Sequence, residues 1–249
     1  MTNKKTISTL VGLMSAGAIA TSIAGEPVAP VAMEEPSPLL TGSIGMGYDS
    51  MYNFRGVDLG PDAIWSGIDF NMALSDAVGL NFGAWYTNPT GSVNGSHATD
   101  ELDLYAFITG NIGDLEVAVG GTGFFFLEDG SDAQELGFTL GYSLGAFDIG
   151  GVYYYDFTTD GHYLELNGGT SIELTERVSL ELGTGISYGE GYYGVSGFNH
   201  VFLTASLPIA ITERLTLSPY ISHTWAVDSL DDLGEGDHLY GGAAFSVDF

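Results

Sequence analysis

The sequence contains no cysteine among its 249 residues. This absence excludes disulfide frameworks, thiolate-ligated zinc sites, cysteine nucleophiles and a lipid-modified N-terminal cysteine. Basic residues are also scarce, since five lysines and arginines stand against 32 acidic residues. A chain this acidic is a poor partner for nucleic acid and for anionic lipid head groups, whereas it attracts small cations.

An apolar run of the length of a membrane helix is also lacking. The run from Leu10 to Ala20 is about half of the roughly 20 residues that a helical span requires. Lys4 and Lys5 precede it and the small residues Ser22 and Ala24 follow it, a pattern that predicts an export signal over residues 1–24. Both lysines lie in that segment, so the exported chain keeps only three arginines as cationic side chains apart from histidine.

Beyond residue 24 the sequence has two distinct parts. Residues 25–39 are rich in Pro, Ala and Glu, which predicts an extended leader. From residue 40 to residue 249 the dominant pattern is a two-residue alternation of apolar and polar side chains, without a helical period. We therefore expect strands and no helix in this part of the chain.

The alternation recurs in about a dozen stretches of the length of tilted membrane strands. Connections such as 75–77 and 113–114 are short, whereas those at 56–62, 89–100 and 228–237 are longer and mostly acidic. This alternation of short turns and long loops is typical of bacterial outer-membrane proteins. The sequence therefore predicts an all-β fold, a transmembrane antiparallel up-and-down β-barrel. Its strands are expected near 42–55, 63–74, 78–88, 101–112, 115–127, 134–143, 147–157, 162–173, 178–188, 198–209, 215–227 and 238–249.

The two faces of these strands differ in charge. One face carries apolar residues such as Ile44, Phe138 and Leu182, with almost no formal charge. The other carries acids among small and polar residues, without the lysines that a soluble sheet uses to protect its polar surface. A charge on the lipid face of a barrel costs a few kcal/mol, about 2–4 at mid-depth, while a lumen charge costs little. We therefore expect a wet interior lined by Asp49, Asp69, Glu101, Asp103, Glu116, Glu135, Asp148, Asp156, Glu165, Glu173, Glu181 and Asp248.

Phe249 ends the last expected strand. An aromatic residue in this place resembles the signal that the bacterial barrel assembly machinery reads in its substrates. Pairing of the strand within the barrel also leaves no open edge in lipid. These features predict a location in the outer membrane of a Gram-negative bacterium, reached through the periplasm, with outer-membrane lipid and lipopolysaccharide as surroundings.

The stretch Ser50–Gly56, Ser-Met-Tyr-Asn-Phe-Arg-Gly, resembles the Ser-Asp-Tyr-x-Phe-Arg-Gly motif of the TorF-like family of outer-membrane porins. Shorter matches follow in the family's order at 67–69, 83–85 and 101–105. Met51 stands where the family usually has Asp. The resemblance covers roughly the first half of the exported chain and implies an outer-membrane barrel with a pore.

Arg55 is the cationic residue that we expect inside the barrel, because the two other arginines fall in short Thr-Glu-Arg turns. The parity of the first strand directs Arg55 inward near the outer mouth, within reach of Asp49, Asp69 or Glu101. Two interpretations remain open: a fixed charge at a constriction that orders a loop or filters ions, or a buried arginine held by acids for stability.

The function that these features predict is passive diffusion of small hydrophilic solutes, with a preference for cations and without a cofactor. Inward Tyr105, Phe107, Phe124 and Phe126 would narrow the lumen. The alternative is a non-conducting barrel with a structural, adhesive or receptor role through its acidic loops. Aromatic residues at strand ends are expected to form an interfacial girdle: Tyr52, Tyr86, Tyr153, Tyr155, Tyr188 and Trp225.

Other chemistry has weak support. Trp65 and Trp85 fall on the inward parity, where packing of the mouth competes with a sugar-stacking platform. The acids of 228–237 lack the spacing of a calcium loop, which leaves loose divalent bridging to lipopolysaccharide. A lipid-modifying enzyme would use Ser222 and His223 with His97, His162, His200 or His238, but adjacent strand residues point to opposite faces. We therefore expect no enzyme.

Overall fold

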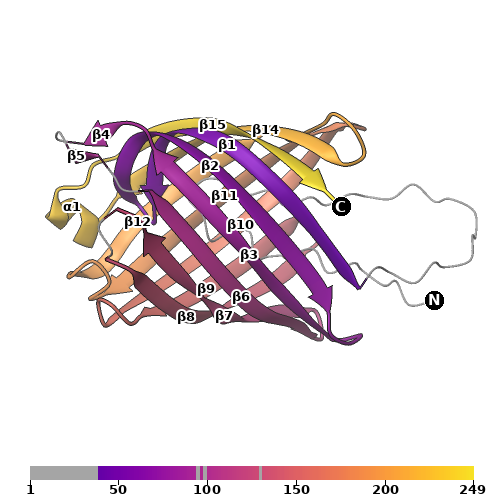
Figure 1. Ribbon diagram of the computed structural model, residues 1–249, viewed down its shortest axis with the longest axis horizontal. Coiled ribbons are helices and arrows are strands. Elements are labelled where there is room, and N and C mark those ends of the chain that lie inside the picture. The colour runs from indigo at the N-terminus through magenta and orange to yellow at the C-terminus, as the bar shows by residue number, and fades with distance from the viewer. Residues whose placement is uncertain (1–38, 94–95, 98–99, 129–130) are drawn as a thin grey trace, which may run out of the picture.

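The computed structural model describes residues 39–93, 96–97, 100–128 and 131–249, which form one closed antiparallel β-barrel (Figure 1). The predicted signal at 1–24 and all of the leader except residue 39 lie outside the described residues. The barrel strands are β1 (Leu40–Phe54), β2 (Val57–Ala73), β3 (Val78–Pro89), β6 (Glu101–Ile112), β7 (Leu115–Phe126), β8 (Ala133–Leu144), β9 (Phe147–Asp156), β10 (Gly161–Thr175), β11 (Val178–Glu190), β12 (Ser196–Ser206), β14 (Leu215–Ala226) and β15 (His238–Asp248).

Four short elements complete the described chain. The strands β4 (Ser92–Val93) and β5 (Ser96–His97) pair with each other in the third connection. The strand β13 (Ile209–Ala210) continues the line of β12 after an interruption at Pro208, whose ring nitrogen has no hydrogen to donate to the ladder. The helix α1 (Ser229–Leu233) lies in the last long loop.

The barrel closes because its first and last strands pair. The β1–β15 register runs from Ser43 opposite Asp248 to Asp49 opposite Gly242, and every other neighbour around the wall is antiparallel. With β12 and β13 counted as one wall strand, the barrel has twelve strands, so the predicted fold class is confirmed. Backbone N–H and C=O groups of the wall are paired around the full circle, which lipid surroundings require.

The outer surface of the wall is an apolar belt. Large apolar side chains on it reach 69 % exposure at Leu166 and alternate with residues that are buried in the interior. Because exposed apolar side chains in such density are unfavourable in water, this belt is the surface that contacts lipid. It confirms the predicted orientation of the two faces. Members of the belt include Ile44, Met46, Ile64, Leu104, Ile108, Val119, Leu136, Phe138, Leu164, Ile186, Leu203, Ile221, Leu239, Phe245 and Val247.

Two local predictions are wrong. Residues 57–62 belong to β2, so the expected long loop at 56–62 is a two-residue turn of Arg55 and Gly56. Both turn residues have positive φ, 51° and 93°, as a tight hairpin turn that matches strand twist requires. The second error is α1, a single turn of helix that Gly234 closes in the left-handed region at φ 87°. No helix in the described part of the chain has the length and hydropathy of a membrane span.

The β1–β2 hairpin bends away from the wall near its tip. The β1–β2 register shifts between Tyr52 and Asn53, and Gly60 opposite Tyr52 has a φ of 150°. A bulge of this kind bends the strand and re-aims its side chains. In Figure 1 the tip of this indigo hairpin lies at the end of the barrel that carries α1, opposite the end at which β15 finishes.

Candidate functional site

The tip of the β1–β2 hairpin crosses the barrel interior. Around the wall, five strands separate β1 from β9 in either direction, so these two strands stand on opposite sides. Arg55 at the tip contacts Glu135 of β8, Tyr154 of β9 and Tyr163 of β10. The hairpin is therefore a strap that connects two facing walls near the mouth of the barrel.

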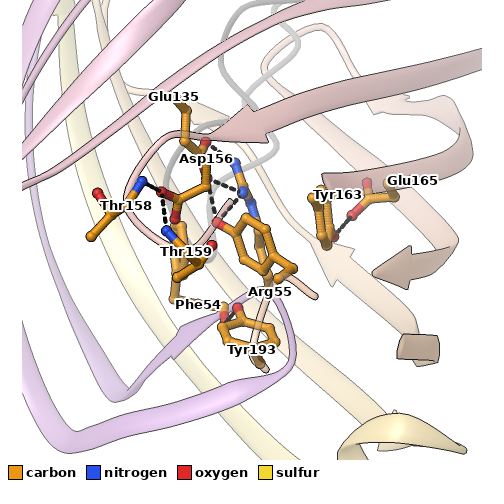
Figure 2. Close-up of polar contacts among 10 residues, drawn as sticks. Phe54, Arg55, Glu135, Asp156, Thr158, Thr159, Tyr163, Glu165 and Tyr193 are labelled. Atoms are coloured by element: carbon orange, nitrogen blue, oxygen red, sulfur yellow. Dashed lines mark hydrogen bonds and ion pairs between the residues drawn. The ribbon is translucent and has the colours of Figure 1, made fainter. Parts of the chain in front are cut away.

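The centre of this contact is an ion pair. The Arg55 guanidinium donates from Nη1 to Glu135 Oε1 at 2.7 Å and from Nη2 to Glu135 Oε2 at 2.8 Å, which is the bidentate geometry that suits a planar fork (Figure 2). Tyr192, in the connection between β11 and β12, accepts a hydrogen bond from Arg55 Nη1 and donates one to Glu135. The three groups form a closed network.

The protonation states in this network follow from its contacts. Burial lowers the pKa of Arg55, but the attraction of Glu135 and Tyr192 raises it further, so the pKa lies well above its ordinary value. Burial raises the pKa of Tyr192, with the Glu135 carboxylate adding to the shift. Arg55 is therefore a permanent cation and Tyr192 a neutral phenol that donates to the carboxylate.

Aromatic rings surround the same guanidinium. Its Cζ lies 4.4 Å from the ring centroid of Tyr163, 4.8 Å from Tyr154 and 5.1 Å from Tyr192. The Tyr163 side chain is 1 % exposed, and Arg55 itself is about 10 % exposed. Cations within about 6 Å of a ring face are attracted to it, more strongly when water is excluded. We call Glu135, Tyr154, Tyr163 and Tyr192 the guanidinium cage.

The other residues of the Tyr-x-Phe-Arg-Gly motif fix the strap in place. Tyr52 donates to Glu101 Oε2 at 2.8 Å, and the Phe54 ring meets Phe124 edge-on with centroids 5.8 Å apart. The Phe54 carbonyl accepts a hydrogen bond from the Tyr193 hydroxyl at 3.1 Å. The structure thus gives a packing or hydrogen-bonding role to each named position of the motif.

Gly56 is required by space as well as by its φ. A Cβ at this position would lie 2.7 Å from both His200 Nδ1 and Leu230 Cδ1. Leu230, on α1, is fully buried, which shows that the helix packs its apolar side chain against the strap. The backbone N–H of Asp58 also donates to Glu235 Oε2 at 3.5 Å, beyond the helix. The last loop and the strap therefore form one packed unit.

Most of the expected interior acids lie on the inner face of the wall with hydrogen-bond donors beside them, whereas Glu173 and Asp248 are exposed near the ends of β10 and β15. Tyr220 donates to Asp49 at 2.7 Å, Tyr105 donates to Asp69, and Ser143 donates to Asp148 at 2.6 Å. The Glu165 carboxylate accepts from Tyr163 and Asn167, and Glu181 accepts from Ser206 at 3.2 Å. Glu116 is half-buried on β7 opposite Gly141. Asp156 instead accepts backbone N–H groups of Thr158 and Thr159 in its own turn (Figure 2).

Asp103 stands apart from these acids. It is 4 % exposed, and its Oδ1 has no hydrogen-bond partner among the described residues. Its cross-strand neighbour Trp85 is buried as well and packs against Tyr52, with ring centroids 5.8 Å apart. Trp65 lies 6.5 Å from Trp85 and over Gly47, where a Cβ would come within 2.6 Å of its ring. The two tryptophans therefore pack against neighbouring residues of the barrel, which agrees with the packing interpretation rather than with a sugar-stacking platform.

Three details of the sequence-based site are wrong. The acid that pairs with Arg55 is Glu135, not Asp49, Asp69 or Glu101, because the strap carries the guanidinium to the far wall. Arg55 lies in a short turn, which the sequence assigned to a strand. Tyr52 does not belong to an outer girdle, since the bulge turns it into the interior at 3 % exposure. Tyr188 and Trp225, by contrast, are on the outer surface.

Sequence reasoning missed the aromatic part of the cage. Tyr154 and Tyr163 alternate with outward residues of β9 and β10, so their inward parity was readable from the strand pattern. Tyr192 and Tyr193 lie in a loop, and no periodicity places loop residues relative to a strand on another wall. The adjacent tyrosines in an otherwise glycine-rich connection were the one local signal.

The residues considered for an enzyme do not converge. Ser222 faces the interior and hydrogen bonds Thr204 at 2.7 Å, whereas His223 faces outward and stacks on Trp225 with centroids 4.2 Å apart. A buried pair that the sequence did not indicate is Ser187 and His200, with Oγ and Nδ1 2.7 Å apart. In the described chain, no group of three or more His, Asp or Glu residues is arranged to hold a metal ion.

Comparisons with known proteins agree on the architecture. No family model and no curated protein matches the chain. Among solved structures, the KdgM porin superposes with a TM-score of 0.55 at 8 % identity, over 83 % of this chain and 99 % of the porin. An outer membrane channel from Pseudomonas putida F1 gives 0.55 at 14 % identity, over 90 % and 100 % of the two chains.

A third similar structure is the translocator domain of the autotransporter NalP from Neisseria meningitidis. Its TM-score is 0.53 at 10 % identity, over 87 % of this chain and 90 % of the domain. At such low identities these likenesses establish the fold, which is that of outer-membrane β-barrels. Solute, partner and mechanism depend on side chains that the superposed structures do not share.

Proposed function

We propose that this protein is an outer-membrane channel that passes small hydrophilic solutes by diffusion and prefers cations. The observation that carries the proposal is the charge of the inner wall. Among the described strand and turn residues that face inward, acids come from eight strands and Arg55 is the one arginine. Like-signed carboxylates around a narrow passage concentrate counter-ions and exclude anions. Water and ions interact with this polar interior, while lipid contacts the apolar belt.

The likeness to outer-membrane porins and channels supports this proposal, as does the motif at Tyr52–Gly56. The same proposal includes membership in the TorF-like family and export through the periplasm. It also includes insertion by the assembly machinery through β15 and the adjoining Phe249. The proposed surroundings are outer-membrane lipid and lipopolysaccharide, with small cations as the permeating or bound species. The proposed mechanism requires no catalytic residue, because diffusion down a gradient forms no covalent bond.

Single-channel recording tests the channel directly. The exported chain is refolded, inserted into a planar bilayer and measured across a KCl gradient, so that the reversal potential reports ion preference. Discrete conductance steps with a cation-selective reversal potential are expected. A barrel that is folded by circular dichroism and heat-modifiable mobility, yet gives no current either as the native chain or as Arg55→Ala, would overturn the proposal.

The strap favours a second candidate function, a non-conducting barrel that acts as a structural, adhesive or receptor protein through its acidic loops. The strap and the buried side chains of Phe107, Tyr163 and Leu230 occupy part of the interior near the mouth. If they block the passage completely, the folded barrel carries no current even after the strap is released by substitution. Recording from an Arg55→Ala variant therefore separates a permanently filled barrel from a closed channel.

A further inference from the structure

We propose that the guanidinium cage is a binding site for small molecules that carry a guanidinium group, and that Arg55 is its built-in occupant. Glu135, Tyr154 and Tyr163 come from β8, β9 and β10, and Tyr192 from the connection after β11. None of these residues belongs to the strap. The carboxylate and three of the four rings around the guanidinium therefore come from the far side of the barrel. The strap brings Arg55 to them together with the fourth ring, Phe54, whose centroid lies 4.8 Å from the guanidinium Cζ.

The geometry of the cage selects a guanidinium rather than any other cation. Two carboxylate oxygens of Glu135 receive two parallel N–H donors at 2.7 and 2.8 Å, a pattern that an ammonium group cannot reproduce. The rings of Tyr154 and Tyr163 lie against the delocalised charge at 4.8 and 4.4 Å. The Tyr192 hydroxyl accepts a third donor from the same group.

The strap is also attached at points that do not involve the guanidinium. Phe54 accepts a hydrogen bond from Tyr193 and its ring contacts Phe124, and Leu230 packs around Gly56. Farther from the turn, Tyr52 donates a hydrogen bond to Glu101 and the Asp58 N–H donates to Glu235. The backbone of Arg55 is strained in this turn, because its φ of 51° lies in a region that non-glycine residues seldom occupy. A free guanidinium compound would meet the same cage without that backbone strain.

The charge of the interior favours delivery of such a ligand. The acids that line the wall attract cations, and a permeating guanidinium compound reaches the cage at the mouth. The tethered Arg55 competes with an effective concentration in the millimolar range or above, as short tethers generally do. We therefore expect weak binding to the native chain and stronger binding once the tethered side chain is removed.

The first experiment uses Arg55→Ala and the probe ethylguanidinium, which replaces the atoms that the substitution deletes. Binding to the folded variant is measured by isothermal titration calorimetry in detergent. Ethylguanidinium should bind at least about tenfold more tightly to this variant than to the native chain. Ethylurea, which has the shape without the charge, and Arg55→Ala/Glu135→Gln, which lacks the carboxylate, are the matched controls. Equal affinity in the controls would overturn the proposal.

A second measurement keeps Arg55 in place and remains informative even if Arg55→Ala does not fold. Because the native sequence has no cysteine, a Val57→Cys variant carries a single thiol beside the turn. Ethylguanidinium should accelerate labelling of this thiol by a maleimide several-fold, while ethylurea should not. An unchanged labelling rate at concentrations up to the solubility of the probe would count against displacement of the strap.

The consequence for transport rests on the proposed function, since displacement of the strap widens a passage only in a channel. The two failures are distinguishable. Binding of ethylguanidinium without current in any variant would retain the site and reject the channel. Current in the native protein without binding to Arg55→Ala would retain the channel and reject the site.

Discussion

Arg55 at the tip of the β1–β2 hairpin forms a bidentate ion pair with Glu135 of β8, with both donor–acceptor distances below 2.9 Å. The two residues are 80 positions apart in the sequence and come from nearly opposite walls of the barrel. A single side-chain pair thus spans the interior and holds the strap in place.

The first prediction concerns stability. Replacing Arg55 by Met leaves the buried Glu135 charge unpaired, which should cost about 3–5 kcal/mol, whereas the double variant with Glu135→Leu should lose much less. Urea unfolding in detergent, followed by tryptophan fluorescence, is measured for the native chain, Arg55→Met, Glu135→Leu and the double variant. The four free energies of unfolding give the coupling energy between the two residues. Additive effects of the two substitutions would show that the pair does not stabilise the strap.

The second prediction concerns conduction. Arg55→Ala removes the group that anchors the strap, so the mean single-channel conductance should rise at least about twofold if the strap narrows the passage. Arg177→Ala is the matched control, because it removes the same charge from an exposed turn at the other end of the barrel. A rise of the same size in both variants would point to surface charge rather than to the strap.

The third prediction concerns the glycine of the turn. Gly56→Ala should destabilise the barrel by about 1–3 kcal/mol, since the new Cβ meets His200 and Leu230 in a backbone region that already disfavours it. Gly145→Ala has a similar φ of 72° but no atom within 4 Å of its Cβ, and should cost only about 1 kcal/mol. Chemical unfolding gives the loss in the free energy of unfolding for each variant, and the difference between the two losses is the cost of the contacts with His200 and Leu230. Equal losses would mean that these two side chains move aside.

The fourth prediction tests which surface contacts lipid. Phe138 and Leu144 lie on the outer face of β8, one near the middle of the strand and the other at its end. Phe138→Arg should cost about 2–4 kcal/mol and Leu144→Arg about 0–1, because a charge is less costly near the interface. Folding titrations into lipid vesicles measure both. A result without depth dependence would contradict the placement of β8 in the bilayer.

The fifth prediction concerns ion preference. Asp69 and Asp148 are half-buried on the inner wall away from the cage, and neutralising both to Asn should shift the reversal potential in a KCl gradient toward zero. Asp114→Asn, in an exposed turn, removes a carboxylate outside the barrel and should leave the potential nearly unchanged. Equal shifts would assign the preference to the rim instead of the interior.

The barrel is readable from the amino-acid sequence alone. Strand alternation is a local property with a period of two, so the lipid-facing residues such as Phe138 and the inward acids such as Asp49 were readable without coordinates. The expectation of about twelve strands followed from the alternating stretches, and an acidic partner for Arg55 was one of the two interpretations that the sequence left open. The parity of the first strand also predicts an inward Arg55. The structure places this side chain inside the barrel, but from a turn that follows the bulge in β1.

The contacts of Arg55, by contrast, depend on the three-dimensional arrangement of the strands. The parity of a strand states which face a residue occupies but gives no distance across a closed barrel. The sequence therefore could not distinguish Glu135 from the acids on strands next to β1. The bulge at Tyr52 and Asn53 and the left-handed turn at Arg55 and Gly56 change direction over a few residues, which interrupts the period on which sequence reasoning depends. The cage then forms because barrel closure brings β8, β9 and β10 to face β1, a relationship that exists only in three dimensions.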